Sequence, residues 1–313
     1  MREPRYLRIS VTGRCSLRCT YCGHTTEDGP DDGHREISPR ELRLLVECAA
    51  GEGVRKVRLT GGEPLVRPDL ERLVAAARAV QHIREVTMTT SGLGLSGRAG
   101  RLRQSGLDRV NISLDTLDPD TYSRITGRDR LSDALDGVLA ASEVFSTVKL
   151  NTVVIGGENL DEMEELVRFA GRHGLWIRFI EQYSSGGSGG AADEPGAAEV
   201  ERRLRSAFEE LVEVQSDTLS VERTYRVPSA HDVRVGIIAA RAGPSCSDCS
   251  KLRYSADGRL LPCLFARTGV PVRAALKDED GEAVRRAIRN AMGRKTCIRS
   301  AGATPEPISR VGG

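Results

Sequence analysis

The chain has 313 residues, of which 39% are hydrophobic, and it carries 46 Lys and Arg against 44 Asp and Glu. This length suits one large domain with an appendage, or two small domains. The near-neutral charge argues against a nucleic-acid-binding protein, and no apolar run is long enough for a membrane span or a signal peptide. The sequence therefore predicts a cytoplasmic globular protein that binds neither nucleic acid nor membrane.

Strand-like and helix-like runs alternate through the first part of the chain. Strands are expected at Tyr6–Val11, Val57–Thr60, Val86–Thr89, Val110–Leu114, Val148–Ile155 and Trp176–Ile180. Helices are expected after a capping box at Ser38 and Glu41, at Leu70–Val80, near Gly100–Gln104, at Leu131–Phe145 and at Leu160–Ala170. Six such units indicate a parallel sheet with right-handed crossovers. The motifs described below follow the strands, which favours an incomplete (βα)₆ TIM-like barrel over a doubly wound sheet.

The second part of the chain has a different composition. Ser184 to Ala198 is rich in Gly and Ser and predicts a flexible loop. An amphipathic helix near Glu199–Leu211, a strand at Val233–Ala240 and a helix at Gly281–Met292 are expected after it. We therefore divide the chain into a partial barrel over 1–183, a loop over 184–198 and a C-terminal region over 199–313.

Three cysteines lie close together directly after the first predicted strand, at Cys15, Cys19 and Cys22. In a cytoplasmic protein such a group indicates metal or cluster ligation rather than disulfides. Three thiolates suit a [4Fe–4S] cluster and leave one iron open to a further ligand. A structural zinc site is the alternative, and it would need a fourth ligand such as His24.

A second cysteine group consists of Cys246, Cys249 and Cys263. It again supplies three thiolates, and no fourth ligand lies at the spacing of a zinc ribbon. A second cluster with an open iron therefore fits this group better than zinc. Cys48 lies in an apolar helical run and is expected to be a small buried residue, whereas Cys297 has no assigned role.

The first cysteine group resembles the signature of the radical S-adenosylmethionine (SAM) superfamily. The spacing Cys-x₃-Cys-x₂-Cys with Tyr21 before the last cysteine matches, and so does Gly61-Gly62-Glu63-Pro64 after the second strand. The resemblance implies that the open iron chelates SAM, that the glycine motif binds the SAM amino group, and that an electron from the cluster releases a 5′-deoxyadenosyl radical.

The whole chain is similar to the GTP 3′,8-cyclase family of molybdenum cofactor biosynthesis. The similarity includes LTGGEPLVRPDL (59–70), VNISLDTLDPDTYSRITGRDR (110–130), LRYSADGRLLPCLF (252–265) and the terminal Gly312-Gly313. It implies an α/β fold, an incomplete barrel closed by a C-terminal region that carries the second cluster. It also implies two [4Fe–4S] clusters, SAM and GTP as ligands, with guanine docked on the second cluster.

The resemblance also assigns roles to single residues. Gly62, Ser113 and the backbones of Tyr21 and Tyr183 match SAM contacts. The positions that match contacts to GTP are mostly basic: Arg8, Lys56, Arg58, Thr89, Lys149, Arg178, Lys251 and Arg253, the last also placed with the catalytic residues. A triphosphate needs several cations, and three of the chain's five lysines (56, 149, 251, 277 and 295) lie among these positions. The terminal glycines match a tail that inserts toward the active site.

Two other interpretations stay open. One is a cyclase-like radical SAM enzyme that acts on another nucleotide in a natural-product pathway, because Ser184–Gly190 and Lys251 depart from the family pattern. The other is a non-catalytic metal-binding or redox module. The sequence does not identify the electron donor, and a homodimer is one assembly that it leaves open.

Overall fold

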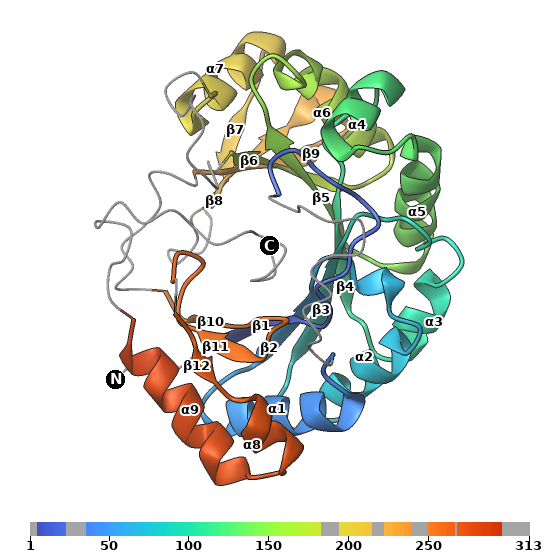
Figure 1. Ribbon diagram of the computed structural model, residues 1–313. Helices are drawn as coiled ribbons and strands as arrows, with labels where there is room; N and C mark the ends of the chain where they lie inside the picture. The colour runs from blue at the N-terminus through green and yellow to red at the C-terminus, as the bar shows by residue number, and fades with distance from the viewer. Residues whose placement is uncertain are drawn as a thin grey trace.

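The computed structural model describes residues 5–22, 36–182, 194–214, 222–239, 249–266 and 268–295. Its strands form a single 12-stranded sheet in the order β12-β11-β10-β1-β2-β3-β4-β5-β6-β9-β8-β7. The sheet curves around a hollow, and the helices lie on its outer side (Figure 1). The two edge strands, β12 and β7, do not pair with each other in the described part of the chain, so the predicted incomplete barrel is confirmed.

The first six strands are parallel and follow one another in chain order across the sheet. They are β1 (Tyr6–Ser10), β2 (Lys56–Thr60), β3 (Glu85–Thr90), β4 (Arg109–Ser113), β5 (Val148–Val154) and β6 (Trp176–Glu181). All six were predicted from the sequence, with ends that differ by at most one residue. In these strands apolar residues, which point to the helices, alternate with mostly polar residues, which point to the hollow.

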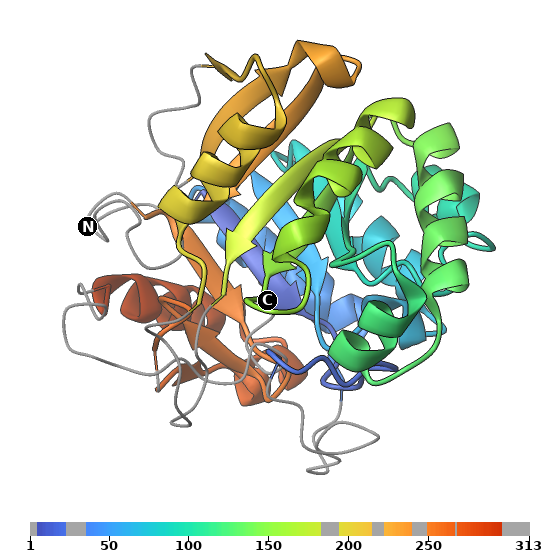
Figure 2. The same ribbon diagram turned by 90° about the horizontal axis from the view of Figure 1, so that it is seen from above.

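The helices between these strands cover the outer face (Figure 2). They are α1 (Pro39–Gly51), α2 (Leu70–Arg78), α3 (Ala99–Gln104), α4 (Pro119–Thr126), α5 (Leu131–Val144) and α6 (Met163–Arg172), with single 3₁₀ turns at η1 (Pro64–Val66) and η2 (Leu160–Glu162). The predicted capping box at Ser38 and Glu41 is present at the start of α1. None of the described helices has the length and apolar character needed to cross a bilayer.

Helix α4 was not predicted, although its start signals stand in the sequence. Asp118 accepts a hydrogen bond from the Thr121 backbone N–H at 2.7 Å, and Pro119 occupies the first helical position. The helix is short, and its buried face contains only two apolar residues, Tyr122 and Ile125, so the sequence gives little sign of it. It lies beside the first cysteine loop: the backbone N–H groups of Arg18 and Thr20 donate to carbonyls of Thr126 and Ile125.

The C-terminal region continues the sheet at both edges. It comprises α7 (Ala197–Ala207), β7 (Val212–Val214), β8 (Glu222–Val227), η3 (Pro228–Ala230), β9 (Val233–Ile238), β10 (Lys251–Tyr254), β11 (Arg259–Leu261), β12 (Val270–Pro271), α8 (Arg273–Lys277) and α9 (Gly281–Gly293). Strand β9 pairs in parallel with β6, and β10 pairs in parallel with β1. Eight adjacent strands, from β10 to β9, are therefore parallel, and the C-terminal region widens the partial barrel.

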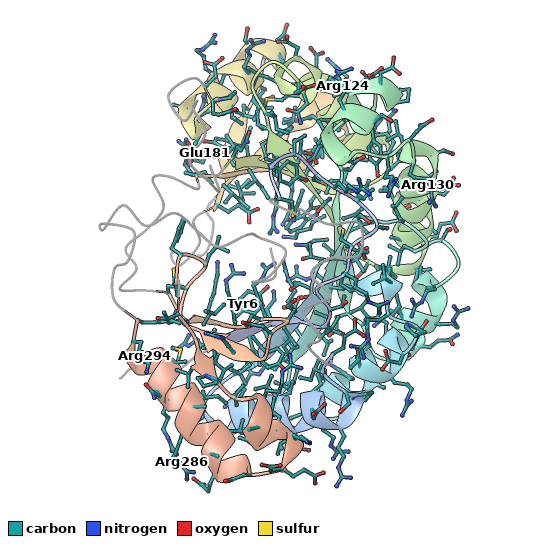
Figure 3. All side chains as sticks on the ribbon, in the orientation of Figure 1. Tyr6, Arg124, Arg130, Glu181, Arg286 and Arg294 are labelled. Atoms are coloured by element: carbon teal, nitrogen blue, oxygen red, sulfur yellow. The ribbon has the colours of Figure 1, made fainter. Side chains whose placement is uncertain are left out.

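The main core lies between the sheet and the helices. Leu7, Ile9, Val57 and Leu59 are fully buried there. Their neighbours in the same strands face inward: Tyr6 lies on the inner side of the sheet, whereas Arg124 on α4 and Arg130 at the start of α5 lie on the outer side (Figure 3). Cys48 is buried in the outer layer with its thiol 3.5 Å from the Gly281 carbonyl, as expected.

Candidate active site

The hollow of the barrel contains a cavity of about 590 Å³. It is lined by inward-facing residues of six parallel strands, by the loop that carries Cys15, Cys19 and Cys22, and by Lys251, Arg253 and Leu264 of the C-terminal region. Residues that are far apart in the sequence thus meet around one space, at the carboxyl ends of the strands and below them. In a parallel barrel this is where ligands bind.

The three thiols of the first cysteine group lie on the loop that leaves β1. All three are free cysteines, and the Leu17 backbone N–H donates to the Cys15 sulfur at 3.4 Å. Burial raises the pKa of Cys15 to about 11 and raises that of Cys19 well above its ordinary value. Burial therefore disfavours the charged thiolate form of these side chains, and bound iron would stabilise it. No group of three ligands for a single metal ion is found among the described residues. A cluster makes no such demand, because each thiolate binds a different iron.

The Gly61-Gly62 pair lets the β2 loop pack directly on the cysteine loop. The Gly62 and Glu63 backbone N–H groups donate to the carbonyls of Thr12 and Arg14, each at 2.8 Å. A Cβ atom on Gly62 would lie 2.2 Å from the Arg14 carbonyl oxygen, which no side chain could tolerate. The glycines are therefore required by this backbone contact, whatever else they bind.

Two buried carboxylates fix the rim around this loop. Glu63, which is 2% exposed, accepts from the Thr90 hydroxyl and from the Ser91 backbone N–H, both at 2.6 Å. Asp115 accepts from the Tyr21 hydroxyl at 2.7 Å and from the Val153 backbone N–H at 2.8 Å. Burial raises the pKa of Glu63, and it raises that of Asp115 to about 6. The two groups tie the ends of β2, β3, β4 and β5 to the cysteine loop.

Below this rim the inner face of β10, β1 and β2 carries two rows of basic residues. The strand register places Arg253, Arg8 and Arg58 in one row. It places Lys251, Tyr6 and Lys56 in the next row. Burial, Arg253 and Arg58 lower the pKa of Arg8, and the Lys56 ammonium lies 5.5 Å from the Tyr6 ring centre. Cations crowded in this way favour an anionic ligand in the cavity.

The opposite wall combines charged and neutral polar groups. Arg178 on β6 forms a two-point ion pair with Glu222 on β8. The Thr89 hydroxyl and the Asn111 side-chain amide line the cavity and have no hydrogen-bond partner among the described residues. Because a buried polar group needs a partner, these groups are suited to a ligand.

Lys149 does not line the cavity but lies at its base. It is buried on β5, and its ammonium lies 3.9 Å from the centre of the Trp176 ring. Burial, followed by the charge of Arg178, lowers the pKa of Lys149 to about 7. Near pH 7 the Lys149 side chain is therefore only partly charged. It lies one layer below the cavity.

The described members of the second cysteine group lie at the other end of the strands. Cys249 precedes β10, which runs parallel to β1, so it lies at the amino end of the strands. Cys263 follows β11, which runs antiparallel to β10 and returns to the same end. The Lys295 ammonium lies 3.2 Å from the Cys249 sulfur. Although burial acts in the other direction, the Lys251 backbone N–H and Lys295 lower the pKa of that thiol.

The structure thus brings most of the predicted site residues to one cavity. The lining includes Arg8, Cys15, Cys19, Tyr21, Cys22, Lys56, Arg58, Gly62, Thr89, Ser113, Arg178, Lys251 and Arg253. Cys249 and Cys263 lie beside it, next to the lining residues Lys251 and Leu264. Tyr183, Cys246, Cys297, the Ser184–Gly190 loop and the terminal glycines lie outside the described residues.

Other lining residues were missed by the sequence reasoning. Asn111 and Asn151 lie in the middle of β4 and β5, and Asp115 follows β4; all three line the cavity. Their signal was available, since a polar residue inside an otherwise apolar strand is unusual. Glu222 gave no such signal, because it begins an amphipathic strand in which polar residues are common.

A three-cysteine loop after the first strand of a partial barrel, packed against a Gly-Gly-Glu-Pro turn, defines a radical SAM enzyme. The Radical SAM superfamily model matches residues 9–170, and the Molybdenum Cofactor Synthesis C model matches residues 175–299. A [4Fe–4S] cluster and SAM are accordingly the cofactors of this enzyme. The residues of the first loop fit them, with three partly buried thiols facing one cavity.

Two relatives refine this class. The GTP 3′,8-cyclase of Streptomyces coelicolor is 38% identical over 91% of this chain and 85% of its own length. The GTP 3′,8-cyclase of Chlorobaculum tepidum is 39% identical over 90% of this chain and 84% of its own length. The chain belongs to the GTP 3′,8-cyclase family.

A solved structure supports the fold independently. SuiB of Streptococcus suis bound to the precursor peptide SuiA superposes with a TM-score of 0.69. The alignment covers 95% of this chain and 67% of that chain at 16% sequence identity. At this identity the likeness speaks for the partial-barrel architecture alone.

Proposed function

We propose that the chain converts GTP into the 3′,8-cyclised nucleotide of molybdenum cofactor biosynthesis, as the family to which it belongs does. The observation that carries the proposal is the pair of basic rows on β10, β1 and β2, which face a cavity with cysteine loops at both ends of its strands. A nucleotide triphosphate carries about four negative charges and needs several such cations. A neutral substrate would leave them uncompensated.

The first loop would hold the catalytic cluster through Cys15, Cys19 and Cys22. When bound, the cluster and SAM supply a 5′-deoxyadenosyl radical, which removes hydrogen from C3′ of GTP. The resulting C3′ radical of the nucleotide attacks C8 of its own guanine, and one electron and one proton complete the product. An external electron donor is required for this chemistry.

The chain's own residues bind and orient the two ligands. Gly62 and Ser113, together with the backbone of Tyr21, would position SAM at the carboxyl ends of the strands. Arg8, Lys56, Arg58, Lys251 and Arg253 would hold the triphosphate from one wall, and Arg178 with Thr89 from the other. The SAM-binding and triphosphate-binding residues would together fix the ribose, so that C3′ lies close to the radical source. Such positioning contributes to the rate.

We also propose a second [4Fe–4S] cluster, held by Cys246, Cys249 and Cys263. The antiparallel turn between β10 and β11 supports it, because this turn brings Cys249 and Cys263 to the same end of the sheet. Three thiolates leave one iron open, where guanine would dock. The Lys295 ammonium at Cys249 would stabilise the thiolate form of that ligand.

The direct test is anaerobic incubation of the reconstituted protein with SAM, dithionite and GTP, followed by mass spectrometry. The expected products are 5′-deoxyadenosine and a cyclised nucleotide of the same mass as GTP with a different retention time. GTP deuterated at C3′ should transfer its label to 5′-deoxyadenosine. Turnover of ATP or another nucleotide in place of GTP would contradict the proposal.

Replacing Arg178 tests whether the second wall binds phosphate. Arg178→Ala should weaken GTP binding by about 1.5–3 kcal/mol, the scale of a charge-assisted hydrogen bond, or about 10- to 150-fold in Kd. Guanosine binding should not change, and neither should SAM cleavage in the absence of substrate. Equal losses for GTP and guanosine in calorimetric titrations would mean that Arg178 supports the fold or contacts the base.

The pKa of Lys149 predicts how GTP affinity depends on pH. Above pH 7 the folded, unliganded protein holds Lys149 largely neutral, since burial lowers its pKa to about 7. Triphosphate favours the ammonium form, so binding must take up a proton, and this becomes harder as the pH rises. The Kd for GTP should therefore increase between pH 7 and pH 9, by up to about tenfold per pH unit.

Lys149→Arg is the matched variant for this measurement. A guanidinium keeps its charge throughout this pH range, so the variant should lose most of the pH dependence while it retains the cation. Calorimetry in buffers with different ionisation enthalpies would report the proton uptake directly. A variant with the same slope as the wild-type protein would assign the dependence to other groups.

A further inference from the structure

One carboxylate stands among the cations of the cavity and is bound to one of them. The Glu222 carboxylate meets the Arg178 guanidinium at two points, with Nε–Oε1 at 3.0 Å and Nη2–Oε2 at 2.8 Å. Both side chains line the cavity, and each is 15% exposed. Arg178 is one of the residues that the proposed function assigns to the triphosphate. A ligand phosphate and Glu222 would therefore compete for the same fork of donors.

The sheet makes room for this pair through a single glycine. Gly236 lies on β9, between β6 and β8, and its register partners are Arg178 on one side and Thr224 on the other. A Cβ atom at Gly236 would lie 2.5 Å from the Glu222 carboxylate and 3.1 Å from Arg178 Cγ. Because position 236 has no side chain, the two charged groups reach each other across β9.

The ion pair of Arg178 and Glu222 can be compared with the other acids near the cavity. Glu85 also pairs with basic residues of the barrel interior, Lys56 and Arg109, but it does not line the cavity. Glu63, Asp115 and Glu181 also line it, and Glu63 and Asp115 accept hydrogen bonds from neutral groups of the rim. Glu222 differs from these acids in its partner and position, because its carboxylate neutralises a cation at the wall where an anionic ligand would bind.

We propose that Glu222 is a specificity-determining residue that occupies Arg178 until a polyphosphate displaces it. The proposal rests on the proposed function, because it concerns the phosphate end of the same site. A polyphosphate carries several charges, and its attraction to the cations of the cavity outweighs the loss of the ion pair. An anion with a single charge does not, so Glu222 keeps such anions out of the cavity. Discrimination of this kind arises from a group that opposes the wrong ligand.

The test compares wild-type protein with Glu222→Gln, both reconstituted anaerobically, in calorimetric titrations with tripolyphosphate and with guanosine. Glutamine keeps the shape of the side chain but frees Arg178 from its counter-charge. Tripolyphosphate should bind the variant about 10-fold more tightly, the scale of one charge-assisted hydrogen bond. Guanosine, which has no phosphate, should bind both proteins equally.

Two further variants make the result specific. Glu164→Gln removes the acid of an exposed pair with Arg168 on α6 and changes the net charge by the same amount, so tripolyphosphate binding should not change. In the Arg178→Ala background, Glu222→Gln should give no further gain. A gain of the same size in that background would overturn the proposal, since the carboxylate would then act without Arg178.

Other results would also overturn it. Weaker tripolyphosphate binding by Glu222→Gln would mean that the acid positions Arg178 for phosphate instead of competing with it. If the glutamine variant fails to fold, Glu222→Asp, which withdraws the carboxylate by one methylene, should show a smaller gain in the same direction. Cyclisation of GTP by the wild-type protein is scored separately, so failure of the proposed function and failure of the Glu222 proposal are distinguishable.

Discussion

Cys19→Ser should abolish the formation of 5′-deoxyadenosine. Cys19 lies in the middle of the first cysteine loop, where its carbonyl accepts a hydrogen bond from the Cys22 backbone N–H at 3.0 Å. Serine preserves the size of the side chain but not the soft sulfur ligand that iron prefers. The cluster that activates SAM would therefore be lost. Chromatography of anaerobic reactions with SAM and dithionite would measure the nucleoside.

Iron analysis separates this loss from general unfolding. Two clusters correspond to about eight irons per chain, so Cys19→Ser should retain about four. Cys48→Ser is the control: Cys48 is buried and belongs to neither group, so its variant should keep the full iron content and SAM cleavage. Undiminished 5′-deoxyadenosine formation by Cys19→Ser would remove the first loop from the chemistry.

The barrel could be predicted from the sequence because its strands are regular. In the six N-terminal strands apolar and polar residues alternate over short runs, and the longer helices between them have clear apolar faces. Helix α4 was missed because it is short and has few apolar residues to mark its buried face. Only Asp118 and Pro119 indicate where it starts.

Of the strands of the C-terminal region, only the one at 233–240 was expected from the sequence, whereas β7, β8, β11 and β12 were not predicted. Residues 233–240 were expected to form a strand, but nothing in their pattern says that they pair with β6. The residues of β10 were matched as a motif, and their pairing with β1 follows from long-range contacts that a local pattern does not contain. The continuity of the two basic rows therefore became visible only in the folded chain.

The candidate site divides in the same way. Lys56 and Arg58 were predicted to share a face from their strand spacing, and both face the cavity. The partner of Arg178 could not be predicted, because Glu222 lies on another strand and reaches Arg178 across Gly236. Neither could the bond between Tyr21 and Asp115, which joins residues 94 positions apart.

Cys249→Ser should separate the two ends of the cavity. SAM would bind at the carboxyl ends of the strands, whereas Cys249 lies at the amino end, where Lys295 contacts its sulfur. The variant should therefore still cleave SAM to 5′-deoxyadenosine but form no cyclised nucleotide, because guanine would lose its docking iron. Its iron content should fall to about four per chain.

The comparison with Cys19→Ser makes this result informative. Both variants should lose the cyclised product and half of the iron, but only Cys249→Ser should still produce 5′-deoxyadenosine, uncoupled from GTP. Mass spectrometry of both nucleosides in one reaction gives the ratio. If Cys249→Ser formed the cyclised nucleotide at the wild-type rate, the second cluster would have no part in binding guanine. The basic rows would then hold GTP by its triphosphate alone.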